Sequence, residues 1–108
     1  MGRETVLEHL GHVDVLVNNA ACSYINLFQC LPPEQVRRLY AVNLTAPVEL
    51  NRLLLPSMLS RHAGCIVNIS SMWGEVGASC EAVYSASKGG INAFTKAMAK
   101  ELGPSHIR

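Results

Sequence analysis

Hydrophobic positions gather in two short runs that have the pattern of β-strands. VDVLVNNAA, from Val13 to Ala21, begins with β-branched residues and ends in a small polar turn, and CIVNISS, from Cys65 to Ser71, follows a glycine. Short apolar runs of this composition, bounded by turn residues, are typical of buried strands. We therefore expect strands at 13–21 and 65–71.

Two longer stretches, one after each run, have the apolar periodicity of helices. The first covers 32–62 and starts at a pair of prolines, which suit the first turn of a helix. Pro47 and Pro56 lie inside it and should bend or break it. The second runs from about 82 to 102, where a Gly-Pro pair is a strong stop signal. The last three residues, His-Ile-Arg, have the composition to begin a third strand.

The elements therefore alternate in the order strand, helix, strand, helix, and both strands are apolar on both faces. This order is typical of α/β proteins, in which right-handed βαβ units build a parallel sheet. Such a sheet normally has more than two strands and carries helices on both faces. The sequence thus predicts the middle portion of a doubly wound parallel sheet.

Composition and charge exclude several classes of function. The 108 residues suffice for one domain, and a net charge of +1 with scattered charges gives no footprint for nucleic acid or an anionic membrane. The longest apolar runs are far shorter than the roughly 20 residues that span a bilayer. Four cysteines without a CxxC pair and four histidines without HxxxH spacing argue against a metal site or a disulfide framework. We expect a soluble cytoplasmic protein with reduced thiols and no metal.

Tyr84 and Lys88 are the first candidates for chemistry. They are four residues apart near the start of the second helix, so both side chains project from one face. A cation within about 4 to 6 Å of a tyrosine hydroxyl stabilises the phenolate, which makes such a pair a suitable acid/base catalyst. The alternative is an amphipathic helix with a packed tyrosine and an exposed lysine, because YxxxK spacing often arises by chance.

Three further polar positions belong to the same region of the predicted topology. Ser71 ends the second strand, and the turn that contains Asn19 ends the first. In open α/β sheets ligands bind at the carboxyl ends of the strands, where both residues lie. Asn43 is a polar amide within an apolar helical stretch and needs a partner or a purpose. A satisfied buried amide is the alternative to a functional one.

The motifs DVLVNNAA, VNL, IVNISS and YSASK, in this order and at these separations, resemble those of the short-chain dehydrogenase/reductases. The resemblance covers nearly the whole chain, from Val13 to Arg108. It implies a Rossmann-like fold and an NAD(P)H-dependent reductase of carbonyl groups, in which the nicotinamide carries the hydride. NADPH is expected rather than NADH.

The resemblance also implies a catalytic role for four residues. Tyr84 would protonate the carbonyl oxygen during reduction, and Lys88 would favour the ionised form of that tyrosine and hydrogen-bond the nicotinamide ribose. Ser71 would hold the substrate oxygen as a neutral donor. Asn43 would order a water in the proton relay to Lys88.

The cofactor groove is implied in the same way. Asn19, with the backbone of Ala20 and Ala21, would line it together with Tyr84 and Lys88. The fourth position of this turn is usually glycine in the family, so the alanine here adds a methyl group beside the cofactor.

A larger departure from the family concerns its phosphate-binding part. No TGxxxGxG turn is present, and the chain stops before the next strand and its Pro-Gly. We therefore expect residues 1–108 to form an incomplete NAD(P)-binding Rossmann-like domain that lacks the N-terminal glycine-rich βαβ part and the C-terminal strands. By itself it should bind little cofactor and be inactive.

The loop WGEVGASCE, between Ser71 and Tyr84, carries the substrate clues. It resembles reductases of Gram-positive bacteria that act on the 5-aminopentanone-modified lysine of elongation factor P. The related 3-oxoacyl-[acyl-carrier-protein] reductases are the alternative, so the expected substrate is a small-molecule or protein-attached carbonyl. Glu81 would pair with an aminated substrate or is a solvated charge, Trp73 is a substrate platform or a loop anchor, and Cys80 is expected to pack.

Two alternative hypotheses assign the chain to other classes of protein. Residues Ser85 to Lys88 match SxxK, the nucleophile motif of hydrolases resembling β-lactamases, but the companion SDN and KTG elements are missing. Alternatively the chain is inactive and retains only helices for subunit association, since the last helix has a face of small residues and the family typically forms homodimers or homotetramers. In the favoured reading Ser85 and Ser87 are small helix residues that let Tyr84 and Lys88 face a ligand.

Overall fold

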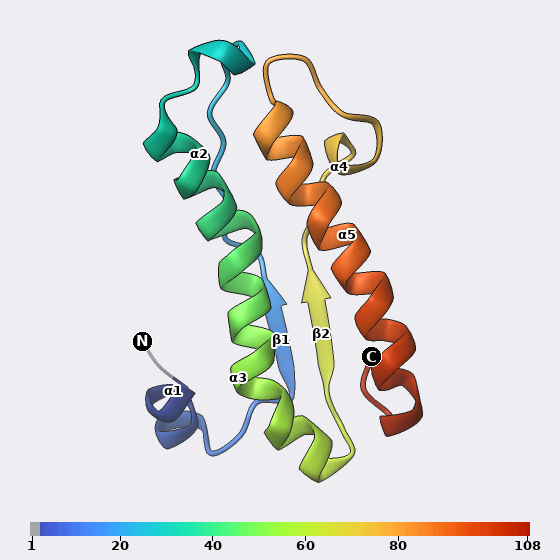
Figure 1. Ribbon diagram of the computed structural model, residues 1–108. Helices are drawn as coiled ribbons and strands as arrows, with labels where there is room; N and C mark the ends of the chain where they lie inside the picture. Colours follow the sequence, from blue (N-terminus) through green and yellow to red (C-terminus); the bar gives the residue numbers. More distant parts are fainter. Residues whose placement is uncertain (1–2) are drawn as a thin grey trace.

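Two parallel strands, each followed by a long helical stretch, form the frame of the molecule (Figure 1). The structure is a computed structural model, and it describes residues 3–108. β1 (Val15–Asn18) pairs in parallel with β2 (Cys65–Asn68), with Val15 opposite Cys65 and Asn18 opposite Asn68. The helical elements in chain order are α1 (Arg3–Leu10), η1 (Phe28–Cys30), α2 (Pro33–Tyr40), the π-helical turn η2 (Ala41–Thr45), α3 (Ala46–Arg61), α4 (Trp73–Val76), α5 (Ala82–Leu102) and η3 (Gly103–Ser105).

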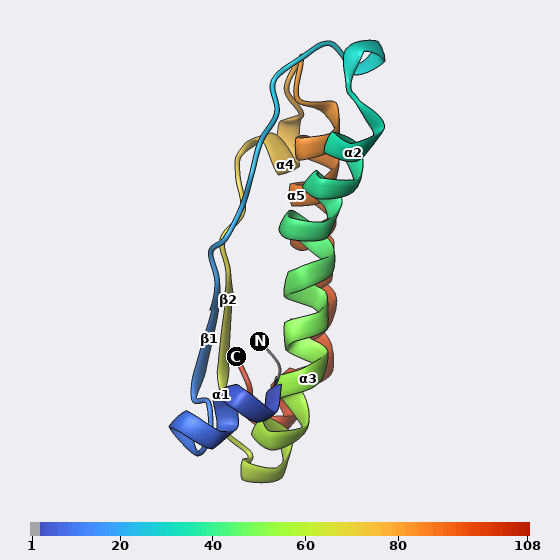
Figure 2. The ribbon, with the colours of Figure 1, turned by 90° about the vertical axis from the view of Figure 1, so that its left-hand side faces the viewer.

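The long helices α3 and α5 cover one face of this sheet (Figure 2). Met58 of α3 is fully buried there against Leu102 and Ile107, and Leu16 of β1 and Ile66 of β2 pack against this cluster. Removing these aliphatic side chains from water is the main stabilising contribution of the layer. The predicted α/β class and the strand-helix-strand-helix order are confirmed.

The opposite face of the sheet has no helical cover among residues 3–108. Val15 and Val17 are each 54% exposed there, and Val67 is 38% exposed. Strands that are apolar on both faces are typical of sheets with helices on both sides. The described residues therefore supply one of the two helical layers that a doubly wound sheet requires.

The predicted helix at 32–62 is divided by the π-helical turn η2. Pro47 is the second residue of α3, and helical backbone runs from η2 through Thr45 and Ala46 into this helix, so the chain does not break at this proline. Pro56 lies inside α3, and the helix continues beyond it to Arg61, so the helix does not break at this position, and the bend expected as the alternative stays a prediction. Its ring lies on the exposed side of the helix, where water can bond the carbonyl group that loses its partner.

The second predicted helix is confirmed by α5, whereas the strands are shorter than their apolar runs. After Asn18 and Asn68 the two segments of the chain leave the hydrogen-bonded ladder and form the loops that carry the polar motif residues. Gly64 and Ile107 form an isolated parallel bridge, which agrees with the expectation of a third strand at the last residues, but the sheet of the described residues has two strands. The helices α1 and α4 were not predicted. No helix that residues 3–108 form is long and apolar enough to cross a membrane.

Candidate functional site

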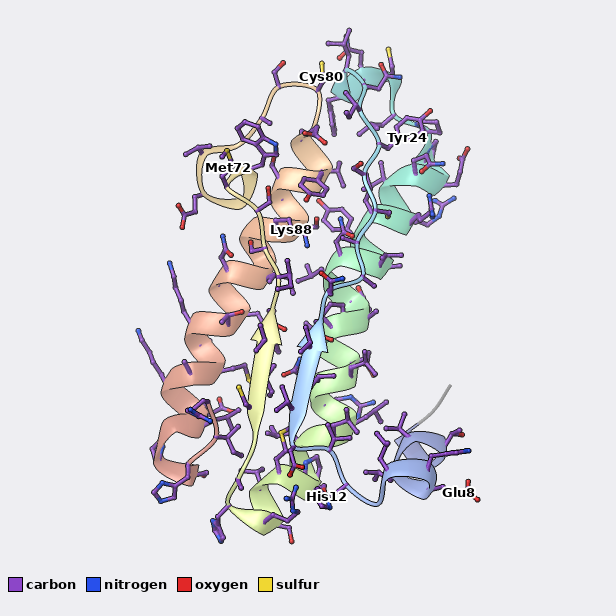
Figure 3. The ribbon with its side chains drawn as sticks, turned by 180° about the vertical axis from the view of Figure 1, so that it is seen from behind. Glu8, His12, Tyr24, Met72, Cys80 and Lys88 are labelled. Carbon is purple, nitrogen blue, oxygen red and sulfur yellow. The ribbon has the colours of Figure 1, made fainter. Side chains whose placement is uncertain are left out.

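The motif residues meet where the two strands end and α5 begins. The chain segment leaving β2 runs along the first half of α5, the segment leaving β1 runs beside α2 and η2, and Lys88 of α5 lies near the ends of the strands (Figure 3). This is the edge of a parallel sheet at which ligands bind in open α/β folds. Local sequence determines the arrangement, because each strand gives way to a polar turn at the same end.

Lys88 is a buried cation on α5. Its side chain is only 3% exposed, and Nζ donates a hydrogen bond to the carbonyl oxygen of Ile69 at 2.9 Å. Nζ also lies 5.9 Å from the centroid of the Tyr84 ring, so the two side chains share one face of the helix, as the spacing predicts. Burial lowers the pKa of Lys88, because the charged form loses hydration. The alternative of an exposed lysine is therefore wrong.

Ser71 begins the turn that leads from β2 into α4. Its Oγ accepts a hydrogen bond from the backbone N–H of Trp73 at 3.2 Å, and its carbonyl oxygen accepts one from the N–H of Gly74 at 2.9 Å. The Ser71 hydroxyl is thus oriented by the backbone while its own proton remains free to be donated. The neighbouring Ser70 donates from Oγ to the carbonyl oxygen of Lys88 at 3.4 Å, which ties this turn to α5.

Asn43 lies within the π-helical turn η2 and is 1% exposed. Its Oδ1 accepts from the backbone N–H of Cys22, its Nδ2 donates to the carbonyl oxygen of Cys22, both at 2.9 Å, and Nδ2 also donates to Ser87 Oγ at 3.3 Å. The carboxamide therefore fastens the loop after β1 to the start of α5. Turns of this kind occur frequently at functional sites. The water-ordering role of Asn43 stays a prediction.

Asn19, Ala20 and Ala21 follow β1 directly and are exposed. Their backbone is held on one side by the pair formed by Asn18 Nδ2 and Asn68 Oδ1 at 2.8 Å and on the other by the clamp of Asn43 on Cys22. An exposed backbone segment fixed at both ends is suited to line a ligand groove. The effect of the Ala21 methyl group on a bound cofactor stays a prediction.

Two serines have more specific contacts than the sequence predicts. Ser87 is fully buried, donates to the carbonyl oxygen of Tyr84 at 2.7 Å and accepts from Asn43. Ser85 accepts from the backbone N–H of Ala78 at 3.1 Å and so holds the loop before α5 against the helix. The sequence signal for these contacts was the position of both serines beside Tyr84 and Lys88 in the YSASK motif. The sequence analysis took the two serines only as small residues, whereas their hydroxyl groups also form hydrogen bonds.

The substrate-loop residues lie at the same end of the molecule. Trp73 is 37% exposed at the start of α4, and Met72 beside it is 68% exposed. Cys80 adopts a left-handed backbone conformation with φ of 66°, and its carbonyl oxygen accepts from the N–H of Asn26 at 3.0 Å. Glu81 precedes the first residue of α5 and is half-buried. The structure thus brings the loops after both strands together around the start of α5.

Comparison with known proteins identifies a matching family model and several similar oxidoreductases. A family model described as "short chain dehydrogenase" matches residues 3–108. The chain is 42% identical over 96 residues to an uncharacterized oxidoreductase of Bacillus subtilis, YmfI, and 44% identical over 93 residues to the ketoacyl reductase HetN of a Nostoc species. These matches cover 89% and 86% of the chain but 40% and 32% of the two relatives.

Solved structures give the same picture. A short-chain dehydrogenase from Streptomyces avermitilis superimposes with a TM-score of 0.93 at 35% identity, over 98% of this chain and 39% of the other. A metagenomic short-chain oxidoreductase in complex with NADP also gives a TM-score of 0.93, at 37% identity, over 98% of this chain and 48% of the other. The chain thus spans less than half the length of these relatives.

Proposed function

Because the chain belongs to the short-chain dehydrogenase family, we propose that it carries the catalytic residues of an NAD(P)H-dependent carbonyl reductase. The observation that supports this most directly is the buried Lys88 ammonium, which lies beside the Tyr84 ring at the carboxyl end of β2. Burying a cation is costly, and such groups are retained mainly where a charge is used. Ser71 lies on the next turn of chain after the same strand.

The residues of this chain would handle the proton and the substrate oxygen. Tyr84 donates its hydroxyl proton to the carbonyl oxygen, while Ser71 donates a hydrogen bond to the same oxygen as negative charge develops on it. The Lys88 ammonium stabilises the tyrosinate that remains. A water held near Asn43 would return the proton through Lys88.

The exposed backbone of Asn19 to Ala21 and the remaining donors of Lys88 fit a nicotinamide nucleotide. Lysine carries three N–H donors, and Ile69 accepts from one, which leaves others for the ribose hydroxyls. The bound cofactor supplies the hydride that the carbonyl carbon receives. NADPH is the proposed form, in keeping with the NADP complex of a relative that is 37% identical.

Tyr84→Phe tests this function in the protein as its gene encodes it. Carbonyl reduction should fall by about 10²- to 10⁴-fold, because the ring keeps its packing but the proton donor is lost. The dissociation constant for NADPH, measured by fluorescence titration, should stay within about twofold. Loss of reduction and of NADPH binding together would assign Tyr84 a structural role instead.

For the substrate we propose the 5-aminopentanone-modified lysine of elongation factor P, with 3-oxoacyl thioesters as the alternative. Glu81 supports the first, because it lies directly before α5 and three residues before Tyr84 in the sequence, and its carboxylate could pair with an amino group of the substrate. A 44% identical relative described as a ketoacyl reductase supports the second. The ratio of kcat/KM for the two substrates, measured on one enzyme preparation, separates these proposals.

Assembly as a homodimer or homotetramer is proposed for the outer face of α5. Of the small residues on this helix, Ala86, Ala93 and Ala97 are exposed, whereas Gly90 packs against Leu44. The exposed alanines let a second helix approach closely. Association through this face without turnover is the remaining alternative, and an inactive but oligomeric protein would support it.

A further inference from the structure

Gly74 of α4 lies directly against the backbone of α5. A methyl group built on its Cα would lie 2.8 Å from the carbonyl carbon of Lys88, 3.0 Å from the backbone nitrogen of Gly89 and 2.9 Å from Nδ2 of Asn92. Ordinary contacts between carbon atoms need about 3.5 to 4.0 Å. Two of the three atoms belong to the backbone of α5 and cannot rotate away.

The requirement for glycine here is steric rather than conformational. The positive-φ glycines of the described chain are Gly11 and Gly77, so Gly74 has a backbone conformation that any residue can adopt. Gly77 is the converse case, with φ of 74° and open space around its Cα. The absence of a side chain at Gly74 therefore serves the packing of the two helices.

This contact connects the two halves of the site. On the α4 side, the N–H groups of Trp73 and Gly74 both bond to Ser71, so Ser71 and Gly74 belong to one hydrogen-bonded turn. On the α5 side, the backbone atoms that a Cβ on Gly74 would meet belong to Lys88 and Gly89. The spacing between the serine and the buried lysine therefore depends on this glycine, together with the bonds that Ser70 and Ile69 make to Lys88.

We propose that Gly74 is a positioning residue, whose missing side chain holds Ser71 at the correct distance from Tyr84 and Lys88. This rests on the proposed reductase function. In Gly74→Ala the backbones must separate by about 0.7 Å, the difference between 2.8 Å and an ordinary contact of about 3.5 Å. Misplacement of catalytic groups by about 1 Å costs up to 10²-fold in rate.

The experiment compares three glycine-to-alanine variants of the protein as its gene encodes it. Gly74→Ala should lower kcat about 10- to 100-fold with the NADPH dissociation constant within about twofold. Gly64→Ala is the destabilised control, because its new methyl would meet Met58 Sδ at 2.6 Å at the other end of the sheet. Gly103→Ala is the neutral control, since nothing lies within 4 Å of its added methyl. Gly64→Ala should lower Tm, and Gly64→Ala and Gly103→Ala should both keep kcat within about twofold of the wild type.

A second substitution identifies which contact matters. Adding Asn92→Ala to Gly74→Ala removes the one clashing side chain but leaves both backbone contacts, so kcat should not recover. Recovery of kcat would overturn the proposal, because it would assign the effect to Asn92. An unchanged kcat in Gly74→Ala would overturn it directly, as would equal loss of kcat and NADPH affinity.

Crystal structures separate this proposal from the function on which it rests. Comparison of wild type with Gly74→Ala should show Ser71 displaced from Lys88 by about 0.7 Å, with Tyr84 and Lys88 unmoved relative to each other. An undisplaced Ser71 would refute the positioning role. A wild-type protein that reduces no carbonyl would instead count against the reductase function, and the displacement would still be measurable.

Discussion

Removing the carboxamide of Asn43 should loosen the loop that follows β1. Asn43→Ala abolishes two bonds of 2.9 Å to the backbone of Cys22 and one of 3.3 Å to Ser87. The two shorter bonds contribute about 1 kcal/mol each, and leaving the partner groups unsatisfied adds about 1 kcal/mol or more. We expect the free energy of unfolding to fall by about 2 to 4 kcal/mol.

The assay is urea unfolding of the protein as its gene encodes it, combined with NADPH titration. Because the clamp fixes one end of the exposed segment Asn19 to Ala21, the affinity for NADPH should fall as well. Asn43→Asp is the matched control of equal shape. Its carboxylate keeps the acceptor for the Cys22 N–H but turns an oxygen toward the Cys22 carbonyl, so it should be no more stable than Asn43→Ala at neutral pH.

This control also has a pH dependence with a defined sign. Only the neutral acid can donate to the Cys22 carbonyl, so burial should raise the pKa of the introduced carboxyl group above its unfolded value. Its stability should then be highest in acid and decline as the pH rises through the folded pKa. A loss below about 1 kcal/mol in Asn43→Ala, with unchanged NADPH affinity, would refute the clamp.

Two further predictions concern α5. Burial lowers the pKa of Lys88 in the folded protein. At pH values between this folded pKa and the unfolded pKa of about 10.4, the unfolded chain binds more protons than the folded one. The stability of the wild type should therefore rise with pH across this window. Lys88→Met should lack this rise in Tm measured from pH 8 to 11, and an identical slope in both proteins would contradict it. Thr95→Val keeps the side-chain shape but removes the acceptor for Asn68 Nδ2 at 2.9 Å, and because this bond is exposed to water, urea unfolding should show a loss of about 0.5 to 1 kcal/mol. Unchanged stability would mean that water replaces the hydroxyl.

Local signals allowed the elements of this fold to be predicted, and their limits explain the errors. The end of α5 follows from the Gly-Pro pair at 103–104, which no helix passes easily. Whether Pro56 breaks the helix depends on which side of the helix faces water, which the apolar periodicity of the sequence does not show. The first strand was drawn too long because the polar turn of Asn19 to Ala21 was counted with the apolar run, whereas the ladder ends at Asn18.

The site was predictable where the motif itself is local. Tyr84 and Lys88 share a helix face by spacing alone, and the structure brings them together. The partner of Asn43 was not predictable, because Cys22 lies 21 residues away and contributes only backbone atoms. The need for glycine at position 74 could not be predicted from the sequence either, because it arises from close contact with the backbone of Lys88 and not from the φ angle of Gly74.

The π-helical turn η2 makes the length of this segment harder to change than its composition. Four buried residues follow one another at intervals of four along this segment: Leu39 in α2, Asn43 in the turn, and Pro47 and Asn51 in α3. An α-helix advances 3.6 residues per turn, so such intervals drift around its axis unless one turn is wider. Deleting a single residue from Ala41–Thr45 would rotate Asn51 and Met58 by about 100° relative to Leu39. We therefore expect natural variants of this segment to differ by substitution and to avoid insertions and deletions.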